Sequence, residues 1–338
     1  MLLEDVSTRK LRKKFTAIGL MFFLFITSTL CFTIFGNEPE ENLKVPEDYI
    51  SFVSSEFVGE QIITSVMYFD SDKGFCEKVL EFESIGYSLG IYQKSTERVY
   101  YTKNIDGAEQ IFLFDLATNE EKQLTDSLFA INYIFPVEDK VYFAARSYGG
   151  VTMRLGVVDI ITNKIQYWLE DEDTSVEYFT VDLNLGKIFV STFSEKELRH
   201  SISRPDNEEF VMPTYSVFET NLDFLETKKL FGDEMWVRTV MTNAGEVIGL
   251  AEKMYVSPDE SSVLYLYNLS SGGLVKNGWT FEKLRGQGAN FSSDGKYIYS
   301  LMSHKDKHGL FSFNVETMKL TPVYVPDNEF ISTINVFK

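Results

Sequence analysis

The 338-residue sequence predicts an all-β protein, a six-bladed β-propeller preceded by one N-terminal transmembrane helix. The first observation is a strand–turn–strand pattern that recurs along the chain from residue 61 onward. The second is composition, because aromatic residues make up 15% of the chain and rings pack well on pleated sheets. The third is an uncharged run near the N-terminus that is long enough to cross a bilayer.

The clearest copy of the repeat covers residues 97–119. A Val- and Tyr-containing run at 97–103 precedes the pair Asp106-Gly107, which favours the positive φ angles of a tight hairpin turn. A second apolar run follows at 110–116. Similar pairs occur at 61–69 with 75–82, 140–146 with 153–159, 186–193 with 213–220, 246–251 with 262–268, and 296–302 with 309–315.

Short apolar runs before and after these pairs bring each unit to four strands. Four antiparallel strands make a propeller blade, and six units of about 47 residues give six blades, with seven as the alternative. The run at 330–337 has no partner in its own unit. We therefore expect it to complete the first blade and close the ring, which leaves no long exposed edge.

An Asp or Asn ends the second run of five units. Such a side chain accepts hydrogen bonds from the backbone that follows it and sets a turn. We therefore assign these residues a structural role and not a catalytic one. They are Asp115, Asp159, Asn221, Asn268 and Asn314.

The N-terminal region predicts a membrane anchor. Residues 15–35 carry no charge, and at about 1.5 Å per residue they span a hydrocarbon core of about 30 Å. Residues 1–14 contain five basic groups, so the positive-inside rule places them in the cytoplasm and the body outside. We expect a single-pass signal-anchor at 15–35, a stalk at 36–48 and the propeller at 49–338. A cleaved signal peptide and a buried core helix are the alternatives.

The charge of the chain is unevenly distributed. Of its 32 basic and 50 acidic residues, five and two lie in residues 1–14, so the remainder carries 27 and 48, a net charge of −21. Such an acidic body repels nucleic acid and anionic lipid, and its simplest role is solubility. The two cysteines, Cys31 and Cys76, cannot form a disulfide within the propeller. An extracytoplasmic domain without disulfides favours a bacterial source.

Residues 114–125 read FDLATNEEKQLT, and residues 290–298 read NFSSDGKYI. These two segments resemble the TolB-type, WD40-like (PD40) propeller repeat. The first is similar to its strand, Asp-Leu-x-Thr-Gly and Leu-Thr half, and the second to the Trp-Ser-Pro-Asp-Gly-Lys half, with Phe291 and Ser293 in place of Trp and Pro. The resemblance covers roughly residues 85–325. It implies the propeller fold and a periplasmic or surface scaffold, or a propeller attached to a peptidase; these residues contain no hydrolase domain.

We predict ligand binding on the face that carries the connections between blades. All three histidines fall in loops between the second and third strands of the fourth and sixth units, which open on that face. The longest insertion, 194–212, lies there too, and loops on a rigid scaffold often carry function. The alternative is that these are ordinary polar loop residues. The predicted ligand-binding residues are Arg199, His200, Arg204, Trp236, His304 and His308.

Catalytic and metal motifs are weak. Two lysines separate His304 and His308 from the acid between them and oppose a cation, so metal binding there is disfavoured. Residues 70–74 begin like a calcium loop but lack the later Glu, which favours a simple turn. There is no Gly-x-Ser-x-Gly elbow. We therefore predict no catalytic residue, no metal and no cofactor.

These observations favour a membrane-anchored, extracytoplasmic propeller that binds a protein or peptide without catalysis. The alternative is a cell-surface propeller enzyme that acts on a carbohydrate or peptide. A deep channel with convergent acids and histidines would indicate the enzyme, whereas a flat aromatic face would indicate the scaffold.

Overall fold

The computed structural model describes residues 49–337 apart from 72, 204–210, 233–235, 244–246, 253–261, 282–283 and 305–306. The chain divides into two compact units, Met1–Val45 and Pro46–Lys338. The predicted basic tail, transmembrane segment and stalk lie outside the described residues. Within the described part, no helix is long and apolar enough to cross a membrane.

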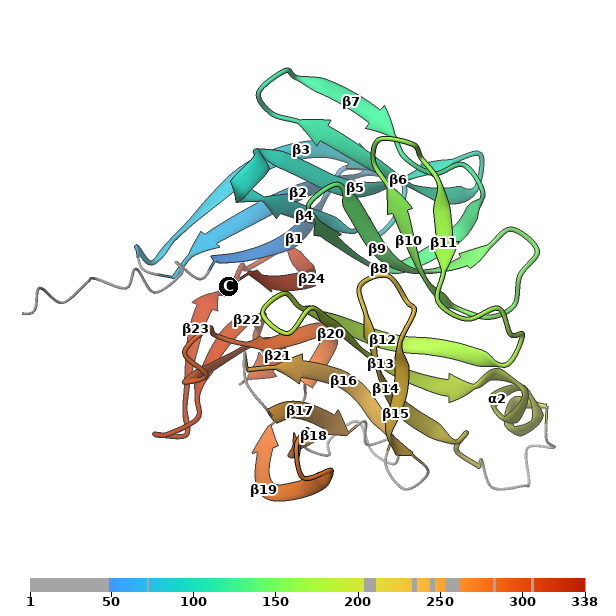
Figure 1. Ribbon diagram of the computed structural model, residues 1–338. Coiled ribbons are helices and arrows are strands. Elements are labelled where there is room, and N and C mark those ends of the chain that lie inside the picture. The colour runs from blue at the N-terminus through green and yellow to red at the C-terminus, as the bar shows by residue number, and fades with distance from the viewer. Residues whose placement is uncertain are drawn as a thin grey trace, which may run out of the picture. The chain divides into compact units, whose positions relative to one another are not determined.

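The described strands form six antiparallel sheets of four strands each. The sheets follow one another along the chain, and each is one blade of the propeller (Figure 1). Blade 1 contains β24 (Phe330–Phe337), β1 (Tyr49–Val58), β2 (Gln61–Asp70) and β3 (Phe75–Ser84). Blade 2 contains β4 (Gly90–Gln93), β5 (Arg98–Ile105), β6 (Ala108–Asp115) and β7 (Glu120–Gln123), with the 3-10 helix η1 (Lys94–Thr96) after β4. Blade 3 contains β8 (Leu128–Val137), β9 (Lys140–Ser147), β10 (Arg154–Asp159) and β11 (Ile165–Tyr167).

The other three blades complete the six-bladed architecture predicted from the repeat. Blade 4 contains β12 (Thr174–Asp182), β13 (Lys187–Ser194), β14 (Tyr215–Asn221) and β15 (Thr227–Gly232), with helix α2 (Glu195–Ile202) after β13. Blade 5 contains β16 (Val237–Thr242), β17 (Val247–Glu252), β18 (Ser262–Asn268) and β19 (Gly273–Phe281). Blade 6 contains β20 (Leu284–Phe291), β21 (Tyr297–His304), β22 (Lys307–Asn314) and β23 (Lys319–Tyr324).

The ring is closed by the C-terminal strand, as predicted. β24 pairs antiparallel with β1, from Tyr49 opposite Phe337 to Ser55 opposite Phe330, so the C-terminus lies beside the first strand (Figure 1). The hairpin at 61–82 differs from the repeat in position. It is formed by the third and fourth strands of its blade, because β1 precedes it and takes the second place.

The strand order defines two faces of the propeller. The loop face, as we call it, carries the connections between blades and the turn between the second and third strands of each blade. The opposite face carries the remaining turns of each blade. The predicted Asp and Asn turns lie on the opposite face, and the described hydrogen bonds confirm their role: Asp115 Oδ1 accepts from the Ala117 and Thr118 amides at 3.1 Å each. Asp159 and Asn314 each accept from the amides two and three residues later in the same way. Asn268 accepts from the Ser271 amide, and Asn221 from the Glu226 amide at the end of a longer turn.

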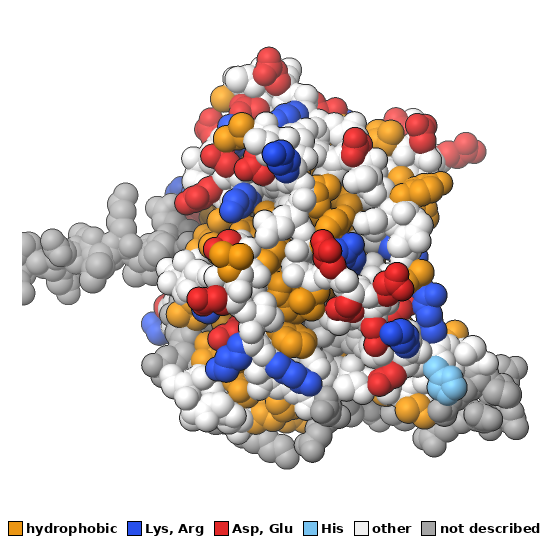
Figure 2. Space-filling view, turned by 45° about the vertical axis from the view of Figure 1, so that its right-hand side comes forward, with side chains coloured by type: hydrophobic (Ala, Val, Ile, Leu, Met, Phe, Trp, Pro, Cys, Tyr) orange, Lys and Arg blue, Asp and Glu red, His pale blue; other side chains and the backbone are white. Residues whose placement is uncertain are grey.

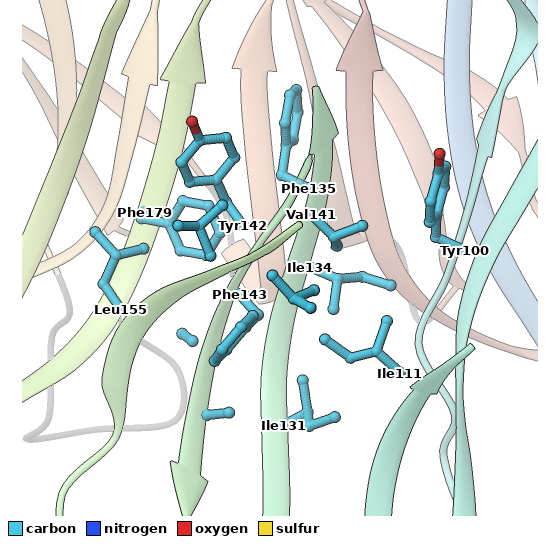
Figure 3. Close-up of a cluster of buried hydrophobic side chains, with 14 of the residues drawn as sticks. Tyr100, Ile111, Ile131, Ile134, Phe135, Val141, Tyr142, Phe143, Leu155 and Phe179 are labelled. Carbon is cyan, nitrogen blue, oxygen red and sulfur yellow. The ribbon is translucent and has the colours of Figure 1, made fainter. Parts of the chain in front are cut away.

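Neighbouring blades pack through buried apolar side chains. In Figure 3, Ile111 of blade 2 lies beside Ile131 and Ile134 of blade 3, and the three belong with Tyr100 to one buried cluster. The blades also approach closely: a Cβ on Gly90 in β4 would lie 2.5 Å from a Val66 methyl group in blade 1. A side chain larger than hydrogen therefore does not fit at that contact.

Phe337 of the closing strand contacts aromatic rings of its own blade and of blade 3. Its ring stacks on Tyr49 of β1 at 4.6 Å and on Phe135 of blade 3 at 5.3 Å between centroids. It is 8% exposed. This stack therefore lies at the opposite-face end of the inner strands and joins the last strand to blade 3.

Replacing Phe337 with alanine is expected to lower the free energy of unfolding by about 3–5 kcal/mol, because it removes a buried ring and leaves a cavity. Phe330→Ala is the control at the other end of the same strand, where the side chain is 50% exposed. Urea denaturation of both variants measures the difference. Equal stability of the two variants would contradict the proposed role of the stack.

Candidate functional site

The predicted insertion at 194–212 contains helix α2, at the loop face of blade 4. Ser194 caps the helix, since its Oγ accepts from the Glu197 amide at 3.2 Å and donates to Asp173 Oδ1 at 3.0 Å. Glu197 Oε2 accepts from the Thr214 amide at 2.6 Å and fastens the return of the chain. The helix is thus held by its first turn and by the strand that follows.

Two of the predicted ligand-binding residues lie on α2. Arg199 and His200 are both exposed, in the last turn of the helix. Arg199 Nε donates to Glu195 Oε1 at 2.8 Å, so its charge is partly matched within the helix. Arg204 lies outside the described residues.

Trp236 enters blade 5 at the loop face, as predicted, and belongs to a row of rings. Its ring packs on Tyr215 at 5.7 Å, and Tyr215 packs on Phe193 at 5.6 Å between centroids. Phe193 and Tyr215 lie on the two strands that flank α2. Trp236, Arg199 and His200 therefore lie on the adjoining loop ends of blades 4 and 5.

The other two histidines lie on blade 6, beyond blade 5. They belong to the ends of strands and not to a loop, with His304 opposite Lys307 and Ser303 opposite His308. Since successive residues of a strand point to opposite faces, His304 and His308 point to opposite sides of the hairpin. His304 packs edge-on against Phe311, and His308 Nδ1 bonds to Ser303 Oγ. The two imidazoles therefore do not converge on one ion.

An apolar cluster that the sequence did not predict lies at the loop face between blades 1 and 2. We call it the blade 1–2 cluster, and its members are large side chains that are half or more exposed. Tyr87 packs on Phe330 at 4.7 Å between ring centroids, and Phe330 lies opposite Ser55, two residues from Phe57. The members, with their exposed fractions, are Phe57 (70%), Ile85 (83%), Tyr87 (56%) and Phe330 (50%).

A cavity of about 210 Å³ adjoins this cluster, and we call it the blade 1–2 cavity. One wall is the connection from β3 to β4, which is fixed because Ser84 Oγ donates to the Gly86 carbonyl at 2.9 Å and Thr102 Oγ1 accepts from the Leu89 amide at 2.9 Å. The other wall is the β5–β6 hairpin. The cavity is lined by Phe82, Glu83, Ser84, Ile85, Gly86, Ser88, Lys103, Asn104 and Glu109.

The cavity lining is acidic. Glu109 is half-buried, its Oε2 accepts from the Ile131 amide at 2.7 Å, and burial raises its pKa above the usual value. Glu83 forms no ion pair with another described residue. The charge of Lys103 is matched outside the cavity, because its ammonium bonds to Glu121 Oε1 and lies 5.3 Å from the Tyr101 ring centroid. The Glu109 carboxylate is thus oriented towards blade 3, and Lys103 towards Glu121 within its own blade.

A second cavity, of about 300 Å³, lies at the loop face between blades 3 and 4. Its polar groups are largely engaged by the protein. The Arg154 guanidinium stacks on Tyr167 at 3.9 Å and donates to the Leu169 carbonyl at 3.1 Å. Asp171 Oδ1 accepts from the Asp173 and Thr174 amides.

The centre of the ring offers little space at the opposite face. The cavity there measures about 30 Å³ and is lined by Phe135, Asp182, Asn290 and Phe337 among others. That volume accommodates about one or two water molecules. Among the described residues, no group of three or more His, Cys, Asp and Glu side chains is arranged to hold a metal ion.

The blade 1–2 cluster was not predicted because the hairpin at 61–82 occupies a different place in its blade from the other hairpins of the repeat. Residues 58–61 join the second and third strands of blade 1, so the end of β1 lies on the loop face. The repeat alone places the turn at 70–74 on that face instead. A strand that ends in two large apolar residues, Phe57-Val58, before the polar turn was the available indication.

Comparison of the coordinates with solved structures shows the fold class. TolB from Acinetobacter baumannii superposes with a TM-score of 0.61 and 14% identity over 85% of this chain, which spans 66% of that chain. A chain of a nidogen/laminin complex gives a TM-score of 0.55 and 9% identity, with 86% and 98% of the two chains covered. An oligogalacturonate lyase in complex with manganese gives 0.49 and 13%, with 82% and 73% covered. No protein-family model and no curated protein matches the sequence.

The protein thus has a six-bladed β-propeller fold similar to that of TolB, the fold that the resemblance of the repeat implied. The ring closes by pairing the last strand with the first. At these levels of identity the comparisons define the fold, and the function has to be argued from the loop face.

Glu109→Gln is expected to stabilise the protein by a small amount at neutral pH, because burial raises the pKa of this carboxyl group and solvent screens part of the effect. A glutamine oxygen still accepts from the Ile131 amide. The folded-state pKa of Glu109 is raised, so ionisation weakens the fold as pH rises above the usual value of 4.5. The gain should therefore be small at pH 4 and larger at pH 7.

Urea unfolding of wild type and variant at the two pH values measures this gain, and the other acids cancel in the difference. The other titratable residues among those that line this cavity are Glu83 and Lys103. A variant that is less stable than wild type at neutral pH would show that the Glu109 charge supports the fold.

Proposed function

We propose that this protein is a membrane-tethered, extracytoplasmic propeller that binds a protein or peptide on its loop face without catalysis. The observation that carries the proposal is the blade 1–2 cluster, an exposed aromatic and aliphatic surface beside the blade 1–2 cavity. Large apolar side chains exposed as a group mark interaction sites more often than scattered ones do. Acidic side chains are frequent over the upper part of the molecule in Figure 2, with hydrophobic side chains exposed between charged ones.

The distribution of candidate chemical groups supports binding over catalysis. His200 and the pair His304 and His308 lie on blades separated by blade 5. Catalysis by general acids and bases needs such groups within hydrogen-bond reach of one reacting centre. The fold is also compatible with protein recognition, since a chain with this architecture occurs in a nidogen/laminin complex.

The tether rests on the sequence. The uncharged segment at 15–35, preceded by five basic residues, supports a signal-anchor with the N-terminus in the cytoplasm. The described part of the chain begins with Tyr49 at the opposite face of the propeller, away from the loop face.

Cysteine labelling is expected to place the propeller outside the cell. The variant Ile161→Cys, at a side chain that is 74% exposed, and the variant Ser7→Cys are each made in a chain with Cys31→Ala and Cys76→Ala. A membrane-impermeant maleimide added to intact bacteria should label the first strongly and the second at background level. Permeabilised cells, in which both react, are the control. Labelling of Ser7→Cys alone in intact cells would reverse the orientation.

Photocrosslinking in the native membrane is expected to locate the binding face. A photoreactive phenylalanine analogue replaces Tyr87 or Arg199 on the loop face, or Leu225 on the opposite face, where that side chain is 79% exposed. Specific adducts should form from at least one loop-face position and not from Leu225. Adducts from Leu225 alone, or from none of the three, would contradict binding on the loop face.

A further inference from the structure

We propose that the outer edge of blade 1 pairs with an extended segment of a partner polypeptide, which adds a fifth strand beside residues 80–84 of β3. This inference rests on the proposed scaffold function and names the segment that binds the partner and the chemistry of that partner. The partner segment is expected to alternate basic and apolar side chains.

The outer strand of blade 1 is the longest of the six outer strands, with ten residues (Figure 1). An outer strand presents unpaired amides and carbonyls, and proteins protect such edges with short strands, lysines, prolines or bulges. The outer strands of blades 2 and 3 have only four and three residues. In the other blades, β15 carries Lys228 and Lys229, β23 contains Pro322, and residues 276–278 interrupt the pairing of β19.

The half of β3 nearer the loop face lacks this protection. Its residues pair with β2 in unbroken register, from Leu80 opposite Val66 to Ser84 opposite Ile62. A bulge at Val79 separates them from the first half of the strand. Residues 80–84 include neither lysine nor proline, and among the described strands only β2 pairs with β3. This half of β3 is therefore a regular, open edge.

The register shows which backbone groups are open. The residues on either side of the two-residue turn 59–60 form a hydrogen-bonded pair within the β1–β2 hairpin. Because this bonding alternates along a strand, the next residue, Ile62, directs its backbone groups to β3, where it lies opposite Ser84. Glu81 and Glu83 therefore direct their amides and carbonyls away from the sheet. No described residue bonds to these four groups.

The side chains of β3 define the chemistry of the partner. The Phe82 ring packs on Tyr101 of blade 2 at 4.7 Å between centroids, so alternation places Glu81 and Glu83 on the other side of the sheet. Lys78 forms an ion pair with Glu81, whereas Glu83 is exposed and has no ion pair with another described residue. Side chains directly opposite each other lie on the same side of a sheet. Basic residues therefore fit beside the two glutamates, and apolar residues fit beside Phe82.

β3 leads directly into the blade 1–2 cluster. Ile85 follows the last residue of the strand and is 83% exposed, and Tyr87 is 56% exposed. A partner strand antiparallel to β3 would run from the loop face towards the opposite face. Its residues before the paired stretch would therefore lie beside the cluster, where apolar side chains can cover Ile85 and Tyr87. The open edge and the exposed apolar surface thus form one continuous binding surface.

A second copy of this chain is a poorer occupant of the edge. Antiparallel pairing of two β3 strands would place Glu81 and Glu83 of one copy beside those of the other, and like charges directly opposite are destabilising. Outside its first 14 residues the chain also has a net charge of −21, so two copies repel each other. A partner with a basic segment is instead attracted.

Peptide selection on the full-length protein in detergent micelles tests the proposal. The probe is a bead-displayed library of random linear octapeptides, and fluorescence anisotropy gives the affinity of each selected peptide. Selected peptides should alternate Lys or Arg with apolar residues. N-methylation of single amides should weaken binding about tenfold at every second position and less than about twofold between them, because only alternate amides of an added strand face β3.

Three variants of the protein separate backbone pairing from charge. Glu83→Pro removes one outward amide and should weaken binding about tenfold or more, while an edge strand tolerates proline where its N–H faces solvent. Glu83→Gln keeps the amide and should weaken binding less than about fivefold. Glu77→Gln, an exposed charge beyond the bulge, is the matched control and should change affinity less than about twofold. Thermal unfolding reports whether each variant is folded, and the N-methyl scan on wild type decides if Glu83→Pro is not.

Four results would overturn the proposal. N-methyl effects without a period of two, or wild-type affinity of a folded Glu83→Pro variant, would place the peptide elsewhere and leave the scaffold function intact. Failure to select any peptide, or selection of peptides without basic residues, would remove the partner chemistry. A dimer in sedimentation that Glu83→Pro dissociates would assign the edge to a second copy. The photocrosslinking experiment tests the scaffold function itself, independently of β3.

Discussion

The pairing of the last strand with the first is the contact on which the rest of the structure depends. β24 and β1 are neighbours in one sheet although almost the whole propeller separates them in the chain. The pairing gives blade 1 its fourth, innermost strand, so that the first blade has the same number of strands as the other five. Phe337 extends this contact through its stacks on Tyr49 and Phe135, so closure joins blade 1 to blade 3 as well as to its neighbour.

Closure also assembles the candidate site. Phe330 comes from the last strand, Phe57 from the first, and Tyr87 from the connection that leads into blade 2. These residues share one surface only when the two ends of the chain are paired. The orientation of Glu109 also depends on blade 3, because the Ile131 amide of that blade donates a hydrogen bond to its carboxylate. The site therefore combines parts of three consecutive blades, and its geometry is a consequence of the closed ring.

Local features were predictable from the sequence and distant contacts were not. The Asp106-Gly107 turn has positive φ at both residues, and the strand-ending Asp115 bonds to its following amides, because both depend on neighbouring residues alone. The number of blades and the closing strand followed from repetition. The place of the 61–82 hairpin did not, since it depends on β24. The side chains of His304 and His308 point to opposite sides because the chain reverses between them. Their spacing of four residues in the sequence does not reveal that reversal.

Acidic residues have different roles on the two faces of the propeller. On the opposite face, the Thr118 and Ala117 amides and Arg98 lower the pKa of Asp115, so its charge supports the turn that it forms. On the loop face, burial raises the pKa of Glu109, and its charge opposes folding. A group whose ionisation weakens the fold is retained more readily where a ligand uses it, since binding sites often trade stability for function. Net acidity alone suggests solubility. The contrast between Asp115 and Glu109 instead separates a charge that supports a turn from a charge whose burial opposes folding.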